Sequence, residues 1–170
     1  MDGKAKVADI LKQEGVEFVF CFPNNVLIDA VAEAGIRPII SRVERTAINM
    51  ADGYTRIKNG NKNGVCIFQA GPGIENAFSG VAQAYSDSTP ILILPGHQGN
   101  GRVGMTSDFN ASSNYQHITK WSDFVNSQER ITEMMRRAYT NLRIGRPQPV
   151  LLEMPNDVMN STYDELNPSY

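Results

Sequence analysis

The sequence predicts an α/β fold: a doubly wound parallel sheet with helices on both faces, giving three layers. Two observations support this prediction. Short apolar runs alternate with segments of helical periodicity along most of the 170-residue chain. The apolar runs are hydrophobic throughout, without the alternation that marks a half-exposed strand, and such strands are typical of parallel sheets that are buried on both sides.

The first 58 residues are predicted to form two strands and three helices. An amphipathic helix begins the chain and ends at Gly15, because glycine commonly terminates a helix. The turn Pro23-Asn24-Asn25 separates the first strand from the second helix, and the second strand runs directly into the third helix. The expected strands are 17–22 and 38–43, and the expected later helices are 26–33 and 44–58.

The rest of the chain adds three strands and two helices. The Gly71-Pro72-Gly73 turn opens a helix that reaches about residue 85, and Gly145 ends the last helix. The polar stretch 99–116 lacks periodicity and is predicted to be an irregular loop, while residues from 156 onward are predicted to be a tail or linker. The expected strands are 65–69, 91–94 and 150–154, and the expected last helix is 129–144.

The composition is that of a soluble globular protein, with 41% hydrophobic and 20% charged residues. The net charge is -2 and there is no basic run, so neither nucleic acid nor a membrane is expected as a partner. No apolar run approaches the roughly 20 residues of a membrane span, and the charged N-terminus does not resemble a signal peptide. We therefore expect a cytoplasmic protein. Cys21 and Cys66 lie in apolar runs and are expected to be buried, reduced thiols.

The predicted topology indicates where a ligand would bind. In open parallel sheets, ligands bind beyond the carboxyl ends of the strands. Residues at those ends are therefore the first candidates for a functional site. In this sequence the ends are the segments 22–24, 43–44, 69–71, 96–98 and 155–156.

Glu44 and the Gly71-Pro72-Gly73 run are the two features at these ends that could carry chemistry. Glu44 stands where the second predicted strand becomes a helix. An acidic residue there is favoured by the helix dipole without any function, although an apolar strand before it also suits a functional carboxyl group. Glycines between a strand and a helix often let the backbone approach a phosphate. This run, however, matches neither the dinucleotide fingerprint nor the P-loop, so a simple tight turn is the alternative.

The sequence does not predict a metal site or a hydrolase triad. His97 and His117 are the only histidines, and neither is near a cluster of other metal ligands. The two cysteines lack Cys-x-x-Cys spacing, and no Gly-x-Ser-x-Gly elbow is present.

Three segments resemble the N-terminal, pyrimidine-binding domain of the acetolactate-synthase-like thiamine-diphosphate (ThDP) enzymes. This family includes acetolactate synthase and the benzoylformate and pyruvate decarboxylases. The resemblance covers residues 4–158, and it implies a pyrimidine-binding domain over 1–158 with a tail or the start of a linker over 159–170. The matching segments are Arg42–Arg56 (RVERTAINMADGYTR), Gly64–Pro95 (GVCIFQAGPGIENAFSGVAQAYSDSTPILILP) and Gly145–Val158 (GRPQPVLLEMPNDV).

The resemblance implies a role for individual residues in activating the cofactor for a 2-keto acid. It implies that Glu44 hydrogen-bonds to ring nitrogen N1′ of the aminopyrimidine and activates the cofactor. Asn24 stands where relatives have glycine, and it can still adopt φ > 0, though less easily. Gln69 stands where relatives often have threonine or histidine, so the substrate is left open. The implied sites are Glu44 and Gln69 as catalytic residues, Pro23, Asn24, Pro72, Gly73 and Asn76 against the cofactor, and Asn110 near the substrate.

The family's diphosphate-binding domain holds Mg²⁺ through a Gly-Asp-Gly segment, and this sequence contains no Gly-Asp-Gly. The resemblance therefore implies a ThDP-dependent lyase or transferase, a decarboxylase or carboligase, that is incomplete without a diphosphate-binding domain or subunit. It also implies a homo- or hetero-oligomer in which the small-residue helix 77–85 packs against a neighbour.

Four interpretations remain open at this point. The chain is either a fragment of a longer enzyme or the alpha subunit of a split 2-keto-acid decarboxylase such as sulfopyruvate decarboxylase. A non-catalytic assembly module is a further interpretation, suggested by Asn24, Gln69 and Asn110. A generic flavodoxin-like binding module is the last.

Overall fold

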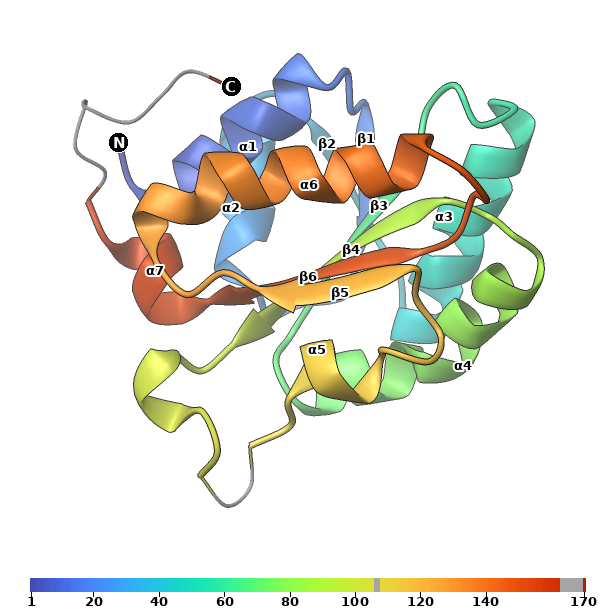
Figure 1. The fold of residues 1–170 in the computed structure, drawn as a ribbon. Helices are drawn as coiled ribbons and strands as arrows, with labels where there is room; N and C mark the ends of the chain where they lie inside the picture. The colour runs from blue at the N-terminus through green and yellow to red at the C-terminus, as the bar shows by residue number, and fades with distance from the viewer. Residues whose placement is uncertain (106–107, 163–169) are drawn as a thin grey trace.

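A computed structural model describes residues 1–105, 108–162 and 170, and its centre is a six-stranded sheet (Figure 1). All neighbouring strands are parallel, in the order β2-β1-β3-β4-β6-β5. The predicted parallel α/β sheet is therefore confirmed. The strands are β1 (Phe18–Cys21), β2 (Arg37–Ile40), β3 (Gly64–Phe68), β4 (Ile91–His97), β5 (Trp121–Phe124) and β6 (Val150–Pro155).

Helices cover both faces of the sheet, which confirms the three predicted layers. Helices α1, α2, α6 and α7 pack on one face, and α3, α4 and α5 lie on the other (Figure 1). The helices are α1 (Gly3–Gln13), α2 (Val26–Glu33), α3 (Glu44–Ile57), α4 (Pro72–Ser86), α5 (Ala111–Asn114), α6 (Ile131–Arg143) and α7 (Asn156–Asn160), with short 3-10 helices η1 (Asn100–Arg102) and η2 (Gln128–Arg130).

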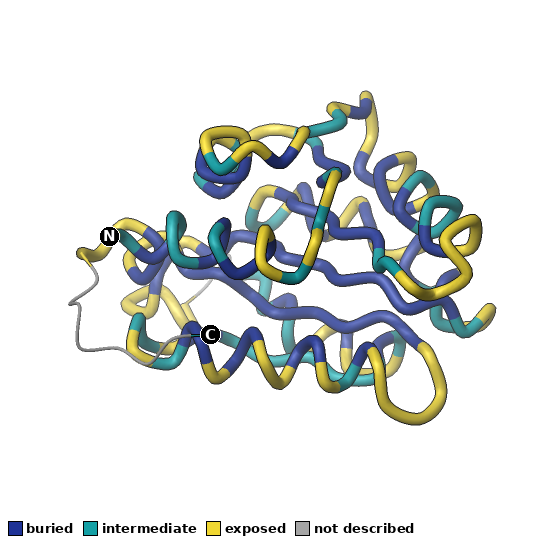
Figure 2. The backbone as a smooth tube through the Cα atoms, turned by 90° about the horizontal axis from the view of Figure 1, so that it is seen from above, coloured by how far each residue is buried: buried dark blue, intermediate teal, exposed yellow. Residues whose placement is uncertain are grey.

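The central strands are buried on both faces because each contributes to two apolar cores. In β3, Val65 and Ile67 belong to the core under α1, α2 and α6, whereas Cys66 and Phe68 belong to the core under α3 and α4. The strands accordingly form a continuous buried layer (Figure 2). Each fully buried side chain of this size contributes roughly 1.5–3 kcal/mol. This two-sided burial explains why the strands read as unbroken apolar runs.

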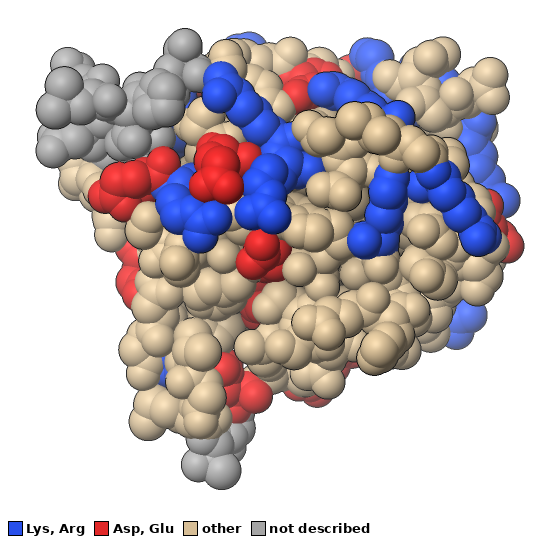
Figure 3. Space-filling view, in the orientation of Figure 1, with Lys and Arg blue, Asp and Glu red and all other residues tan. Residues whose placement is uncertain are grey.

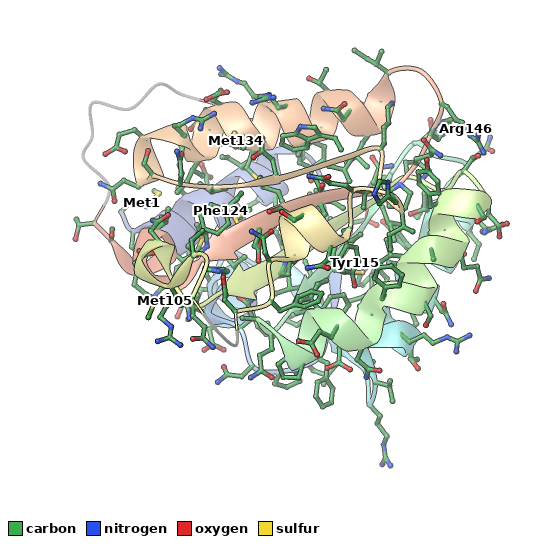
Figure 4. All side chains as sticks on the ribbon, turned by 60° about the horizontal axis from the view of Figure 1, so that its bottom comes forward. Met1, Met105, Tyr115, Phe124, Met134 and Arg146 are labelled. Atoms are coloured by element: carbon green, nitrogen blue, oxygen red, sulfur yellow. The ribbon has the colours of Figure 1, made fainter. Side chains whose placement is uncertain are left out.

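The two cores lie on opposite sides of the sheet, as two labelled side chains illustrate. Met134 projects from α6 into one core, and Tyr115, just after α5, lies in the other (Figure 4). The outer surface of α6 carries paired charges, with Arg130 Nε 3.0 Å from Glu133 Oε2. Basic and acidic side chains are interspersed over this helix (Figure 3). The helix itself contains three exposed arginines and one exposed glutamate, so basic side chains outnumber acidic ones on its outer surface.

The prediction for residues 99–116 was incomplete, and β5 was not predicted. The stretch contains η1 and the short helix α5, with Ala111 fully buried. Strand β5 lies at the sheet edge, pairs only with β6, and has four half-buried residues of mixed polarity, Trp121–Phe124. An edge strand needs no continuous apolar run, so the sequence pattern contains no signal for it.

The prediction that residues from 156 onward are only a tail or linker was wrong for the first five of them. Residues Asn156–Asn160 form α7, whose Val158 and Met159 are buried in the core beside α1. Two apolar residues are enough to dock one helical turn, but too few to produce a recognisable periodicity. Most of the predicted tail 159–170 lies outside the described residues.

Both cysteines are free and buried, which confirms the predicted reduced thiols. Burial raises the pKa of Cys21 to about 11 and raises that of Cys66 well above the ordinary range. Both groups therefore remain protonated near neutral pH. Among the residues that the structure describes, no helix has the length and apolar character needed to cross a membrane.

A pair of glycine substitutions tests the packing of α3 against β3. A Cβ at Gly64 would lie 2.4 Å from the carbonyl oxygen of Ala51 in α3, so we expect Gly64→Ala to lower the free energy of unfolding by about 1–3 kcal/mol. Gly53, inside α3, has no atom within 4 Å of its Cβ position. Gly53→Ala should instead stabilise the protein by about 0.5–1 kcal/mol. Urea denaturation of both variants measures these values, and equal effects would contradict the packing.

Candidate functional site

The carboxyl ends of four strands surround a cavity of about 250 Å³. It lies beyond β1, β3, β4 and β6, at the edge where the topology places ligands. Three residues that the sequence predicts as site residues, Asn24, Gln69 and Pro72, line it. The lining residues are Asn24, Asn25, Val26, Gln69, Ala70, Pro72, Gly96, Gln98 and Asn156.

Glu44 is the first residue of α3 and is buried, with 7% of its surface exposed. Asn76 Nδ2 donates to Glu44 Oε2 over 2.6 Å. None of the described residues donates a hydrogen bond to the second oxygen, Oε1. Strand β2 ends at Ile40, earlier than predicted, and Ser41 Oγ shapes the connection by donating to the Val43 carbonyl oxygen over 2.9 Å. Glu44 is therefore held at one oxygen and free at the other.

The Gly71-Pro72-Gly73 run brings the end of β3 against Glu44. Gly71 has φ +65° and precedes α4, and Pro72 is the first helical residue, a position that suits proline. A Cβ at Gly73 would lie 2.8 Å from Gln69 Cβ and 3.7 Å from Glu44 Oε1. The missing side chain thus lets the start of α4 pack closely against Gln69 and near the free carboxyl oxygen of Glu44.

Asn25 fixes the turn after β1 to the end of β3. Its Oδ1 accepts from the Leu27 amide over 2.9 Å and caps α2, while its Nδ2 donates to the Phe68 carbonyl oxygen over 2.7 Å. Asparagine is a preferred capping residue because its side chain satisfies a free amide at the helix start. This residue was predicted only as part of a turn. Its dual role depends on the β1–β3 pairing, which local sequence does not reveal.

Asn24 and Asn110 are placed differently from what the sequence suggested. The peptide bond between Pro23 and Asn24 is cis. Asn24 does not use the φ > 0 conformation available to it, since the described non-glycine residues with positive φ are Asn59 and Ser88. Asn110 lies outside the cavity lining, and its Oδ1 accepts from the Ser113 amide over 2.8 Å, which caps α5. A substrate contact for Asn110 stays a prediction.

Sequence reasoning missed a buried group of ionisable side chains behind the cavity. His97 is 2% exposed, and its Nε2 lies 3.0 Å from Asp108 Oδ1 in a contact that is not aligned as a hydrogen bond. Its Nδ1 accepts from the Gly99 amide over 3.1 Å. Glu153 in β6 accepts from the amides of Ala111 and Ser112 over 3.2 and 3.0 Å. These contacts anchor both ends of the 99–112 segment.

Glu153 carries the signal that could have revealed this group. It is the only charged residue in the apolar run VLLEM, 150–154, and a buried carboxylate needs partners. Burial raises the pKa of Glu153, and the hydrogen bonds from Ser112 and Ala111 and the proximity of His97 oppose the rise. No group of three or more His, Cys, Asp or Glu residues suited to a metal ion occurs in the described part of the chain.

Comparison with known proteins relates this geometry to one family. The family model "Thiamine pyrophosphate enzyme, N-terminal TPP binding domain" matches residues 1–137. The probable acetolactate synthase large subunit of Methanocaldococcus jannaschii is 31% identical over 96% of this chain and 28% of its own length. The acetolactate synthase large subunit of Lactococcus lactis is 34% identical over 97% of the chain and 29% of its own length.

A third relative has the same pattern of coverage. The acetolactate synthase isozyme 3 large subunit of Escherichia coli is 30% identical over 94% of the chain and 29% of its own length. The chain therefore spans less than a third of the length of these curated relatives.

The raised pKa of Glu153 predicts a pH-dependent difference in stability. Folded Glu153 retains its proton at pH values where the unfolded chain has lost it, so the contribution of Glu153 to stability falls as the pH rises from about 4.5 through the raised pKa. Glu153→Gln removes this loss. Its free energy of unfolding relative to wild type should therefore increase between pH 4.5 and neutral pH, by about 1.4 kcal/mol for each unit by which the pKa is raised.

Glu133→Gln is the matched control for this urea-denaturation series. Glu133 is exposed, and Arg130 lowers its pKa, so its contribution has the opposite sign and is screened by solvent. A Glu153→Gln difference that stays constant with pH would show that Glu153 does not retain its proton in the folded state.

Proposed function

The chain belongs to the family of thiamine pyrophosphate enzymes, whose N-terminal TPP-binding domain it matches, and from this premise we propose that it forms the pyrimidine-binding part of a 2-keto-acid decarboxylase or carboligase of the acetolactate-synthase type. Thiamine pyrophosphate is the same cofactor as ThDP. The observation that carries the proposal is Glu44, buried, bonded at one oxygen and free at the other beside Gly73.

The residues around Glu44 suit the aminopyrimidine of the cofactor. A weakly basic ring nitrogen requires a partner that both donates and accepts a proton, and a carboxyl group does both. Glu44 Oε1 has no donor among the described residues, and no side chain at Gly73 fills the adjacent space. Glu44 would therefore bind N1′, while Pro23, Asn24, Pro72, Gly73 and Asn76 would lie against the ring.

The bound cofactor supplies the carbon nucleophile that attacks a 2-keto acid and allows carbon dioxide to leave. The chain's own part is to hold and move one proton. Asn76 fixes Glu44 Oε2, and Oε1 is then left to share a proton with N1′. Gln69, which packs against Gly73, would face the reacting atoms as an uncharged donor and acceptor.

We propose that residues 1–158 are the pyrimidine-binding domain and that 159–170 begin a linker or tail. The diphosphate and its Mg²⁺ would be held by a further domain or subunit, because the sequence lacks Gly-Asp-Gly and spans less than a third of its relatives. Assembly as a homo- or hetero-oligomer in the cytoplasm follows from this proposal.

Two alternatives keep the family but change the role. An alpha subunit of a split 2-keto-acid decarboxylase, such as sulfopyruvate decarboxylase, would use Glu44 in the same way. A non-catalytic assembly module would not need a buried carboxyl group, whose desolvation is costly. The burial of Glu44 therefore favours an enzyme component.

Glu44→Gln tests the proposed role. The amide keeps the shape of the side chain but cannot transfer a proton, so we expect turnover to fall at least about a hundredfold. The measurement is decarboxylation of pyruvate by the chain assembled with its diphosphate-binding domain or subunit, ThDP and Mg²⁺.

The control is Glu75→Gln in α4. Glu75 also lies in the first turn of a helix, but it is exposed and outside the cavity lining, so we expect nearly unchanged turnover. Thermal unfolding of both variants verifies that they fold. If folded Glu44→Gln retains the activity of wild type, the assignment of the activating carboxyl group is wrong.

A further inference from the structure

The cavity beside Glu44 is lined by a distinctive set of side chains. Five of its nine lining residues carry a carboxamide group, and the other four are apolar residues or glycine. None of the nine is ionisable. The carboxamides belong to Asn24, Asn25, Gln69, Gln98 and Asn156.

Four of these five carboxamides are available to a ligand. Asn25 is occupied, because it caps α2 and bonds to the end of β3. The side chains of the other four make no hydrogen bond to any residue that the structure describes. They come from four separate segments: the turn after β1, the residues after β3 and β4, and the first residue of α7.

The hydrogen-bond donors and acceptors of a carboxamide complement those of a hydroxyl group. A carboxamide has two N–H donors and one carbonyl acceptor, and a hydroxyl group donates once and accepts twice. An alkyl group covering this surface would leave desolvated polar groups without partners. A second carboxylate would enter a cavity whose own lining offers no compensating positive charge. The lining therefore suits a neutral, hydroxyl-bearing group.

The positions of the carboxamides indicate which part of a substrate each one would contact. Gln69 packs against Gly73, whose Cβ position lies 3.7 Å from Glu44 Oε1, so Gln69 is the carboxamide near the proposed chemistry. Gln98 and Asn156 follow β4 and β6, which lie farther across the sheet from β2, the strand that leads to Glu44. They would thus meet the part of a substrate that lies away from the reacting carbon.

We propose that this carboxamide cavity selects a hydroxylated 2-keto acid and binds the hydroxyl group of its acyl chain through Gln98 and Asn156. The inference rests on the proposed function and extends it by naming the substrate class. Gln98 and Asn156 are specificity residues in this scheme, and Glu44 remains the catalytic one.

A binding measurement tests the cavity without turnover. The ligands 4-hydroxy-2-ketobutyrate, 2-ketobutyrate and 2-ketoglutarate are titrated separately into the isotope-labelled chain, and the side-chain NH₂ signals of Gln98 and Asn156 are followed by NMR. The hydroxylated ligand should reach half-saturation at a concentration about threefold to tenfold lower than 2-ketobutyrate, the gain expected from one hydrogen bond. Equal half-saturation, or tightest binding of 2-ketoglutarate, would overturn the inference.

Near-isosteric variants test which residues produce the preference for the hydroxylated ligand. Gln98→Leu and Asn156→Leu should each remove most of the preference for the hydroxylated ligand. Gln13→Leu is the matched control, because Gln13 is exposed on α1 and outside the cavity. Survival of the full preference in both cavity variants would contradict the assignment.

Turnover by the assembled enzyme separates this inference from the proposed function. The ratio of kcat/KM for the hydroxylated to the unsubstituted acid should fall towards unity in Gln98→Leu. Glu44→Gln should lower kcat/KM for both acids, and Gln13→Leu, outside the cavity, should leave the ratio unchanged. If wild type turns over neither acid, the proposed function is wrong. The NMR titration then still tests whether the cavity prefers the hydroxylated ligand. If wild type turns over both equally, the selectivity fails and the proposed function stands.

Discussion

The close contact between α3 and α4 is the constraint on which the site depends. Gly80 of α4 lies against Ile48 of α3, where a Cβ would come within 2.9 Å of Ile48 Cγ2. Helices packed this closely keep their first turns side by side, and Asn76 then reaches Glu44 over 2.6 Å. Any larger residue at position 80 would move the helices apart. The carboxyl group at the sheet edge is therefore positioned by a contact more than a helical turn away from it.

At the carboxyl ends of the strands, the ionisable side chains lie apart from the uncharged lining of the cavity. Glu44 lies outside the cavity lining, and the lining itself is uncharged. Three further ionisable side chains, His97, Asp108 and Glu153, are engaged with each other or with backbone amides of Gly99 and Ala111. Asn76 and the dipole at the start of α3 both act on the Glu44 carboxyl group. The proposed recognition of a substrate in the cavity would rely on hydrogen bonding rather than on charge.

The sequence predicts the parts of the structure whose signals are local. The strands β3, β4 and β6 are continuous apolar runs because both their faces are buried, and helix α2 was located at its observed bounds by the turn before it and Gly35 after it. Strand β5 was missed because its pairing with β6 determines it, not its composition. Gln98 and Asn156 lie at predicted strand ends, but the sequence did not show that they share one cavity. Fifty-eight positions separate them in the chain, and only the pairing of β4 with β6 brings them to one cavity.

The bond from Asn25 to Phe68 also bears on when the site is assembled during folding. Its partners are 43 positions apart, and β1 pairs with β3 although β2 lies between them in the chain. Contacts between distant segments form slowly, because a long loop must first lose its conformational freedom. Helix α2 involves only local contacts and can form early. Its capping residue Asn25 can bond to Phe68 only after β1 has paired with β3. A newly made chain would acquire its overall shape before it acquires a cavity able to bind.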